Sequence, residues 1–105
     1  MSSTPEIDIE RFATAGPSGT VVDVRQRHEY AAGHVGGALA IPMGQLPSRV
    51  HELDQSKPVY VICATGNRSL AMTDLLRAAG FNAWSVAGGT SAWARSGRPV
   101  EEGLR

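Results

Sequence analysis

The sequence is poor in the residues that build metal centres and disulfides. It contains one cysteine, Cys63, and three histidines, His28, His34 and His51. A single cysteine cannot form an internal disulfide, and the histidines do not stand at the spacing of metal ligands. We therefore expect neither a zinc centre nor a disulfide-stabilised domain, and no cofactor.

Excess charge and long apolar runs are also missing. Ten Lys and Arg residues balance ten Asp and Glu residues, so electrostatics give no reason to expect nucleic acid or an anionic membrane as a partner. No apolar stretch approaches the roughly 18 residues of a membrane-spanning helix. The segment MSSTPEIDIE lacks the basic and apolar regions of a signal peptide, and a lone cysteine fits a reducing compartment. We therefore expect a cytoplasmic protein.

The length and composition fit one folded domain. The chain has 105 residues, of which 42% are hydrophobic and 19% are charged. This length allows one hydrophobic core and is too short for two. We expect a single domain over residues 1–105.

Short strand-like runs alternate with helical patterns along the chain. The expected strands lie at residues 6–9, 20–24, 38–41, 58–62 and 82–86. The expected helices lie between or after them, at residues 10–16, 27–33, 45–53, 69–80 and 88–97. This alternation predicts an α/β fold with a parallel sheet flanked by helices on both faces.

The clearest expected helix has the sequence SLAMTDLLRAAG and covers residues 69–80. Gly80 suits the left-handed residue that follows many helices. The apolar stripe that we expect to face the sheet comprises Leu70, Ala71, Leu75, Leu76 and Ala79.

Cys63 lies where the apolar run PVYVI ends and this helix is about to begin. Ligands of parallel sheets gather at the carboxyl ends of the strands. Gly66 and Asn67 most easily adopt positive φ, so the loop after Cys63 can curl with its N–H groups pointing inward. The alternative is that Cys63 is a small, inert residue at the edge of the core.

The two interpretations differ in the expected state of the thiol. A pKa near 8.5 leaves only about 3% thiolate at pH 7, whereas a pKa near 6.5 gives roughly three-quarters. That difference corresponds to about 2.7 kcal/mol, and a helix N-terminus supplies at best about 2 kcal/mol. A reactive thiolate therefore needs the loop amides as well, with some help from Arg68.

Three segments together carry a resemblance to a known family. CATGNRS begins at Cys63, VVDVRQRHEYAAGHVGGALAIP covers residues 21–42, and VAGGTSAWARSGRPV covers residues 86–100. In this order, and over nearly the whole chain, they resemble the active-site loop and the flanking motifs of the rhodaneses.

The resemblance implies a five-stranded parallel sheet flanked by helices, with Cys63 as the nucleophile of a sulfurtransferase. A donor such as thiosulfate or a low-molecular-weight persulfide would give its sulfane sulfur to Cys63, and a thiol or cyanide would accept it in ping-pong order. Arg68 would bind the anionic oxygens of the donor. The loop that would bind the transferred sulfur comprises Ala64, Thr65, Gly66, Asn67, Arg68 and Ser69.

The sequence departs from the family pattern at two positions. Gly36 stands where the family often has proline, in a turn that touches no chemistry. Ala64 stands where the family often has arginine, which removes a positive charge beside the site. This second difference disfavours thiosulfate as the preferred donor.

Other polar residues are expected to support the site. Asp23 ends a strand near the same sheet edge, where it could bind the loop or the turn that supports it. Arg25 and Glu29 are four residues apart and are expected to pair with each other. We expect His34 to be a hydrogen-bonded structural residue. Trp84 and Trp93 are expected in the core or in a pocket wall.

Two alternatives to a small-molecule sulfurtransferase follow from the same loop. Dual-specificity phosphatases and arsenate reductases are relatives of this fold that place five residues between cysteine and arginine, whereas this chain has four. By comparison with these families, the shorter loop is expected to suit one sulfur atom better than a tetrahedral oxyanion. The other alternative is a persulfide relay that passes sulfur to an acceptor protein with little small-molecule turnover.

Overall fold

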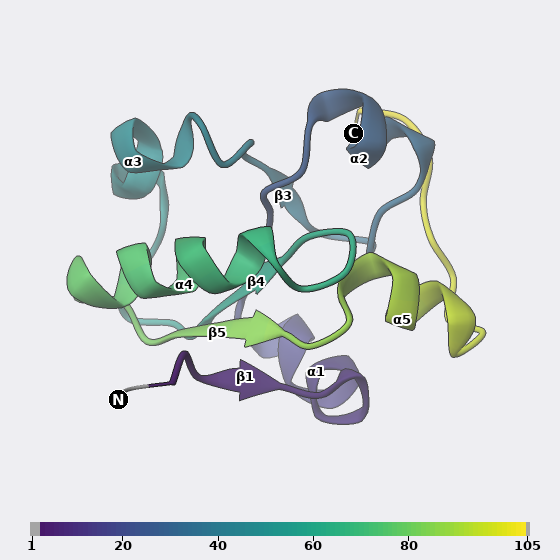
Figure 1. The fold of residues 1–105 in the computed structure, drawn as a ribbon, viewed down its shortest axis with the longest axis horizontal. Helices are drawn as coiled ribbons and strands as arrows, with labels where there is room; N and C mark the ends of the chain where they lie inside the picture. Colours follow the sequence, from purple (N-terminus) through teal and green to yellow (C-terminus); the bar gives the residue numbers. More distant parts are fainter. Residues whose placement is uncertain (1–2, 105) are drawn as a thin grey trace.

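The computed structural model describes residues 3–104, so both ends of the predicted domain, residues 1–2 and 105, lie outside the described part. Five parallel strands form one sheet in the order β1-β5-β4-β2-β3 (Figure 1). The strands are β1 (Glu6–Ile7), β2 (Thr20–Asp23), β3 (Leu39–Ala40), β4 (Val59–Ile62) and β5 (Ala83–Val86). The predicted α/β fold with a five-stranded parallel sheet is confirmed.

The helices are α1 (Ile9–Ala15), α2 (Arg27–Ala32), α3 (Leu46–Arg49), α4 (Arg68–Ala78) and α5 (Gly89–Arg95). Each falls within or beside an expected helical segment. The third is shorter than expected, because the segment continues after α3 as a single 3₁₀ turn over Val50–Glu52. Among residues 3–104, no helix has the length and apolar character needed to cross a membrane.

Cys63 directly follows the central strand β4, among the carboxyl ends of the strands. β4 pairs with β2 on one side and with β5 on the other, and all four of its residues are buried. A strand buried on both faces of a parallel sheet has this continuous apolar sequence. Cys63 follows its last residue, so the cysteine lies at the carboxyl ends of the strands, as predicted.

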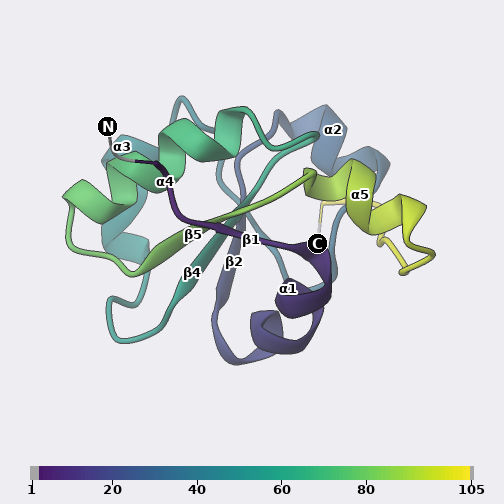
Figure 2. The same cartoon turned by 60° about the horizontal axis from the view of Figure 1, so that its bottom comes forward.

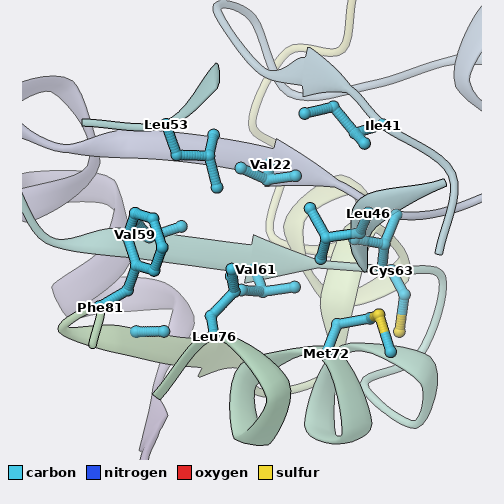
Figure 3. Packing of buried hydrophobic residues seen from close by; sticks show 12 residues of the cluster. Val22, Ile41, Leu46, Leu53, Val59, Val61, Cys63, Met72, Leu76 and Phe81 are labelled. Atoms are coloured by element: carbon cyan, nitrogen blue, oxygen red, sulfur yellow. The ribbon is translucent and has the colours of Figure 1, made fainter. Parts of the chain in front are cut away.

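Helices cover both faces of the sheet, and each face has its own hydrophobic core. α4 lies on one side of the sheet and α1 on the other (Figure 2). The core under α3 and α4 includes Val22, Val61, Met72 and Leu76, and Cys63 packs at its edge (Figure 3). The core on the opposite face is built around aromatic and aliphatic side chains: Phe12, Val21, Tyr30, Val35, Ala38, Tyr60, Ile62 and Val86.

The face of α4 that packs on the sheet differs from the predicted stripe. Its buried residues are Ser69, Met72, Thr73 and Leu76. Of the predicted stripe only Leu76 is fully buried, whereas Ala71 and Ala79 are exposed and Leu70 and Leu75 are partly buried. The reason is that the first turn of α4 points Ser69 at Cys63, which turns the polar Ser69 and Thr73 inward and rotates part of the apolar stripe toward solvent.

The start of α5 packs directly against the loop that follows Cys63. The N–H of Thr90 donates to the Cys63 carbonyl at 2.8 Å, and the N–H of Ser91 donates to the Ala64 carbonyl at 2.9 Å. Gly89 has φ +59°, and a Cβ atom there would collide with both carbonyl oxygens. Only glycine allows this close approach.

We predict that Leu76→Ala lowers the free energy of unfolding by about 2–5 kcal/mol, because it empties a fully buried site in a close-packed core. The matched control is Leu70→Ala, which removes the same atoms from a partly buried position earlier in the same helix. Urea unfolding of both variants measures the difference. Equal losses would contradict the assignment of the buried face.

We predict that Gly89→Ala destabilises the protein more than Gly97→Ala. Both glycines have positive φ, for which alanine costs about 1–2 kcal/mol. A Cβ atom at Gly97 meets nothing within 4 Å, whereas one at Gly89 collides with the loop. Thermal unfolding of the two variants measures the additional loss. If Gly97→Ala is at least as damaging, the packing of α5 on the loop is not important for stability.

Candidate functional site

The loop after Cys63 curls around the cysteine sulfur. Cys63 Sγ accepts hydrogen bonds from the N–H of Gly66 at 3.1 Å and from the N–H of Ser69 at 3.4 Å. Gly66 has φ +104°, as predicted, but Asn67 has φ −87° and belongs to the right-handed region. The inward-pointing amides are therefore confirmed, with one left-handed residue instead of two.

Two buried serines extend the hydrogen bonding of the sulfur. Cys63 Sγ lies 3.4 Å from Ser69 Oγ, which in turn lies 2.7 Å from Ser85 Oγ. Both serines are fully buried. A thiol donates its proton to Ser69, whereas a thiolate accepts the proton of Ser69 and leaves Ser85 to donate to Ser69 Oγ. The hydroxyl pair can therefore satisfy either form of the sulfur.

Ser85 was missed in the sequence, although a signal for it exists. It lies two residues after Ala83 in β5 and is paired in register with Val61 in β4. Alternation along the strand places Ser85 on the same face of the sheet as Ala83, which belongs to the core under α4. A polar residue on that face of a buried strand, level with the start of α4, is the pattern that could have identified it.

The surroundings of Cys63 favour the thiolate. Burial raises the pKa of the thiol, but the hydrogen bonds from the Ser69 hydroxyl and from the amides of Ser69, Gly66 and Thr65 outweigh it, so the pKa is lower than usual. The hydrogen-bond donors that surround the sulfur are thus sufficient to overcome desolvation. Cys63 is only 1% exposed, so its side chain has almost no contact with solvent.

The side chain of Arg68 binds Glu29 of α2. The guanidinium makes two parallel hydrogen bonds to the carboxylate, at 2.8 and 2.9 Å. The bonds from Arg68 lower the pKa of Glu29 to about 2, against the opposing effect of burial, with a further contribution from the N–H of Gln26. The predicted pair of Arg25 and Glu29 is therefore wrong.

Asp23 and Arg25 form a second, buried ion pair. Arg25 Nη2 lies 2.8 Å from Asp23 Oδ2 and also donates to the Gly33 carbonyl at 2.8 Å. Among the hydrogen bonds of residues 3–104, none joins either side chain to the Cys63 loop. Of the two predicted roles of Asp23, binding to the loop is therefore wrong, and the carboxylate instead supports a turn through Arg25.

The remaining candidates make structural contacts. His34 is buried, with Nδ1 2.7 Å from the Tyr30 carbonyl and its ring stacked on that of Tyr30 at 3.7 Å. Trp84 and Trp93 are partly buried against the core on the α1 face, in agreement with the expectation. The structure thus brings residues 63–69 together and leaves the histidine and the tryptophans in the scaffold.

Solved structures share this architecture. A rhodanese-related protein from Thermoplasma volcanium is 33% identical and matches 96% of this chain and 99% of its own, with a TM-score of 0.89. A thiosulfate sulfurtransferase from Pseudomonas aeruginosa is 29% identical over 95% of this chain and 20% of its own, with a TM-score of 0.83. The fold of this chain is that of a rhodanese.

Sequence comparison gives the same result. The candidate sulfur carrier protein YrkF of Bacillus subtilis is 35% identical over 76% of this chain, which spans less than half, 45%, of YrkF. The candidate sulfurtransferase YtwF of the same organism is 35% identical over 75% of this chain and 77% of its own. The family model of the rhodanese-like domain matches residues 9–96. The chain therefore belongs to the rhodanese-like domain family of sulfurtransferases and sulfur carriers.

Proposed function

We propose that the protein is a sulfurtransferase that carries sulfane sulfur as a persulfide on Cys63. The observation that carries this proposal is that the Cys63 sulfur accepts hydrogen bonds from N–H groups of the loop, which lower the pKa of the thiol. A structural cysteine needs no such surroundings. The lone reactive thiol also fits a reducing compartment such as the cytoplasm.

The first step loads Cys63. Its thiolate attacks the terminal sulfur of thiosulfate and forms an S–S bond, while sulfite leaves with the electron pair of the broken bond. With a protonated low-molecular-weight persulfide, the thiolate attacks the terminal sulfur in the same way and a thiolate leaves. Both donors carry the reactive sulfur at a slender end, which suits a cysteine that is 1% exposed.

The second step unloads the persulfide. An acceptor thiolate or cyanide attacks the outer sulfur, and Cys63 leaves with the electron pair of its S–S bond. The products are a new persulfide or thiocyanate, together with the original thiolate. The hydrogen bonds that stabilise the thiolate also make Cys63 a good leaving group. They come from the N–H of Gly66 and from the N–H and hydroxyl of Ser69.

The other loop residues shape the site. Ala64, Thr65 and Asn67 form the turn between the strand and α4, with the Ala64 carbonyl held by α5. Asp23 and Arg25 support the neighbouring turn at Gly33. The four residues between Cys63 and Arg68 give a small loop, which favours one sulfur atom over the tetrahedral oxyanion of phosphatases and arsenate reductases.

A persulfide relay is the second candidate function. The relative YrkF is named as a candidate sulfur carrier, and this chain matches under half of it. In a relay, the acceptor is a cysteine of a partner protein, and the chemistry at Cys63 is the same. The relay differs only in transferring sulfur slowly to small thiols and quickly to its protein acceptor.

We predict that Cys63→Ser abolishes the transfer of sulfur from thiosulfate or a persulfide to cyanide. Cys63 is the only thiol of the chain, and a serine hydroxyl cannot form the persulfide. The measurement is thiocyanate formation, with circular dichroism as the control for folding. Thiocyanate produced by the folded variant at the parental rate would refute the proposed intermediate.

We predict that Ser69→Ala raises the pKa of the Cys63 thiol, because the Ser69 hydroxyl is the largest of the contributions that lower it. The pH at which the thiolate appears should then increase, which the ultraviolet absorbance of the thiolate measures. The matched control is Ser91→Ala, since Ser91 binds the loop through its backbone N–H. An unchanged titration in Ser69→Ala would show that the hydroxyl does not stabilise the thiolate.

A further inference from the structure

The guanidinium of Arg68, which ends the Cys63 loop, is already bound to a carboxylate. Both terminal nitrogens of Arg68 donate to Glu29, one to each carboxylate oxygen. Glu29 is also fixed from its own side, since its Oε1 accepts the N–H of Gln26 at 3.0 Å in the capping box of α2. The geometry is the bidentate arrangement in which arginine and carboxylate bind most strongly.

The second cation at this edge of the sheet is also paired with a carboxylate. Arg25 and Asp23 neutralise each other in a buried bridge. The pairs influence each other. The hydrogen bonds between Arg68 and Glu29 are the main cause of the low pKa of Glu29 and the raised pKa of Arg68, and Arg25 and Asp23 add smaller contributions in the same directions. Together the four side chains carry no net charge.

The reacting sulfur adds a negative charge to this neutral edge. After Glu29, which is the main cause, the negative charge of Cys63 also contributes to the raised pKa of Arg68. The position after the cysteine is Ala64, which supplies no cation. A doubly charged donor therefore approaches a thiolate whose neighbouring cations, Arg25 and Arg68, are already paired with carboxylates.

A thiosulfate ion that takes the bidentate position on the two terminal nitrogens of Arg68 must first displace Glu29. The displaced carboxylate would lose two charge-assisted hydrogen bonds and stay beside the incoming anion. A protonated low-molecular-weight persulfide carries no charge at its reacting end and needs no such exchange, because its reacting sulfur is held by the loop amides.

We propose that Glu29 is a specificity-determining residue, which keeps Arg68 from binding doubly charged donors and so selects persulfides of low charge over thiosulfate. This inference rests on the proposed sulfur transfer through Cys63. It concerns the choice of donor and not the chemistry of the sulfur.

The alternative role of the pair is structural, since it joins the first turn of α2 to the first turn of α4. If the pair is a structural clamp, its removal would move the loop and lower the transfer rate for all donors equally. If its charge selects donors, its removal would change the transfer rate for thiosulfate alone. The ratio of the two rates separates these roles.

The test compares Glu29→Gln, Arg68→Gln and the double variant with the parental protein. Glutamine at position 29 keeps an oxygen for the capping bond to Gln26 and removes only the charge. The donors are thiosulfate and the persulfide of 2-mercaptoethanol, with cyanide as the acceptor. The quantity measured is the kcat/KM for thiosulfate divided by that for the persulfide, with circular dichroism as the folding control.

We expect Glu29→Gln to raise this ratio by about tenfold or more, since one charged hydrogen bond to a donor corresponds to roughly 10- to 150-fold. Arg68→Gln should lower the ratio, because it leaves Glu29 unpaired, and the double variant should return it close to the parental value. The gain in Glu29→Gln should shrink at high salt.

Two outcomes overturn the inference in distinguishable ways. If the proteins transfer sulfur but the ratio stays constant, or both rates fall together in each variant, then the pair is only a clamp and the proposed function stands. If the parental protein forms no thiocyanate from either donor, the proposed function fails, and the inference fails with it.

Discussion

The site depends on one interaction, the convergence of backbone N–H groups on the sulfur of Cys63. The Gly66 amide reaches it because Gly66 takes a positive φ, and the Ser69 amide reaches it because α4 begins at Arg68. α5 fixes the loop from behind, where Gly89 leaves room for two hydrogen bonds to its carbonyls. These local requirements lower the pKa of a thiol that burial alone would raise.

The sequence was sufficient for the order of the elements and for the position of Cys63. Alternating strand and helix patterns define a parallel sheet, and the last apolar residue of β4 places the next residue at its carboxyl edge. The side-chain contacts were less predictable. Leu70 was expected on the buried face of α4, yet the loop geometry turned Ser69 inward instead, and the spacing of apolar residues contains no information about that rotation.

Ion pairs were the least predictable feature, because the spacing of charged residues along the sequence does not show which side chains meet in space. The four-residue spacing suggested Arg25 with Glu29, but Arg25 binds Asp23, two residues before it. Glu29 instead binds Arg68, 39 residues away in the sequence. Only the three-dimensional arrangement of α2 beside α4 brings these charges together. That arrangement pairs Arg68, which was expected to bind the anionic oxygens of the donor, with the carboxylate of Glu29.

The most direct test of whether Cys63 carries sulfur as a persulfide is the intact mass of the protein after incubation with a persulfide donor and removal of excess reagent. Formation of a persulfide on Cys63 predicts an added mass of one sulfur atom, located at Cys63 by peptide mapping and lost on addition of cyanide, with thiocyanate released in equal amount. A folded protein that gains no sulfur from either the persulfide or thiosulfate would contradict the claim.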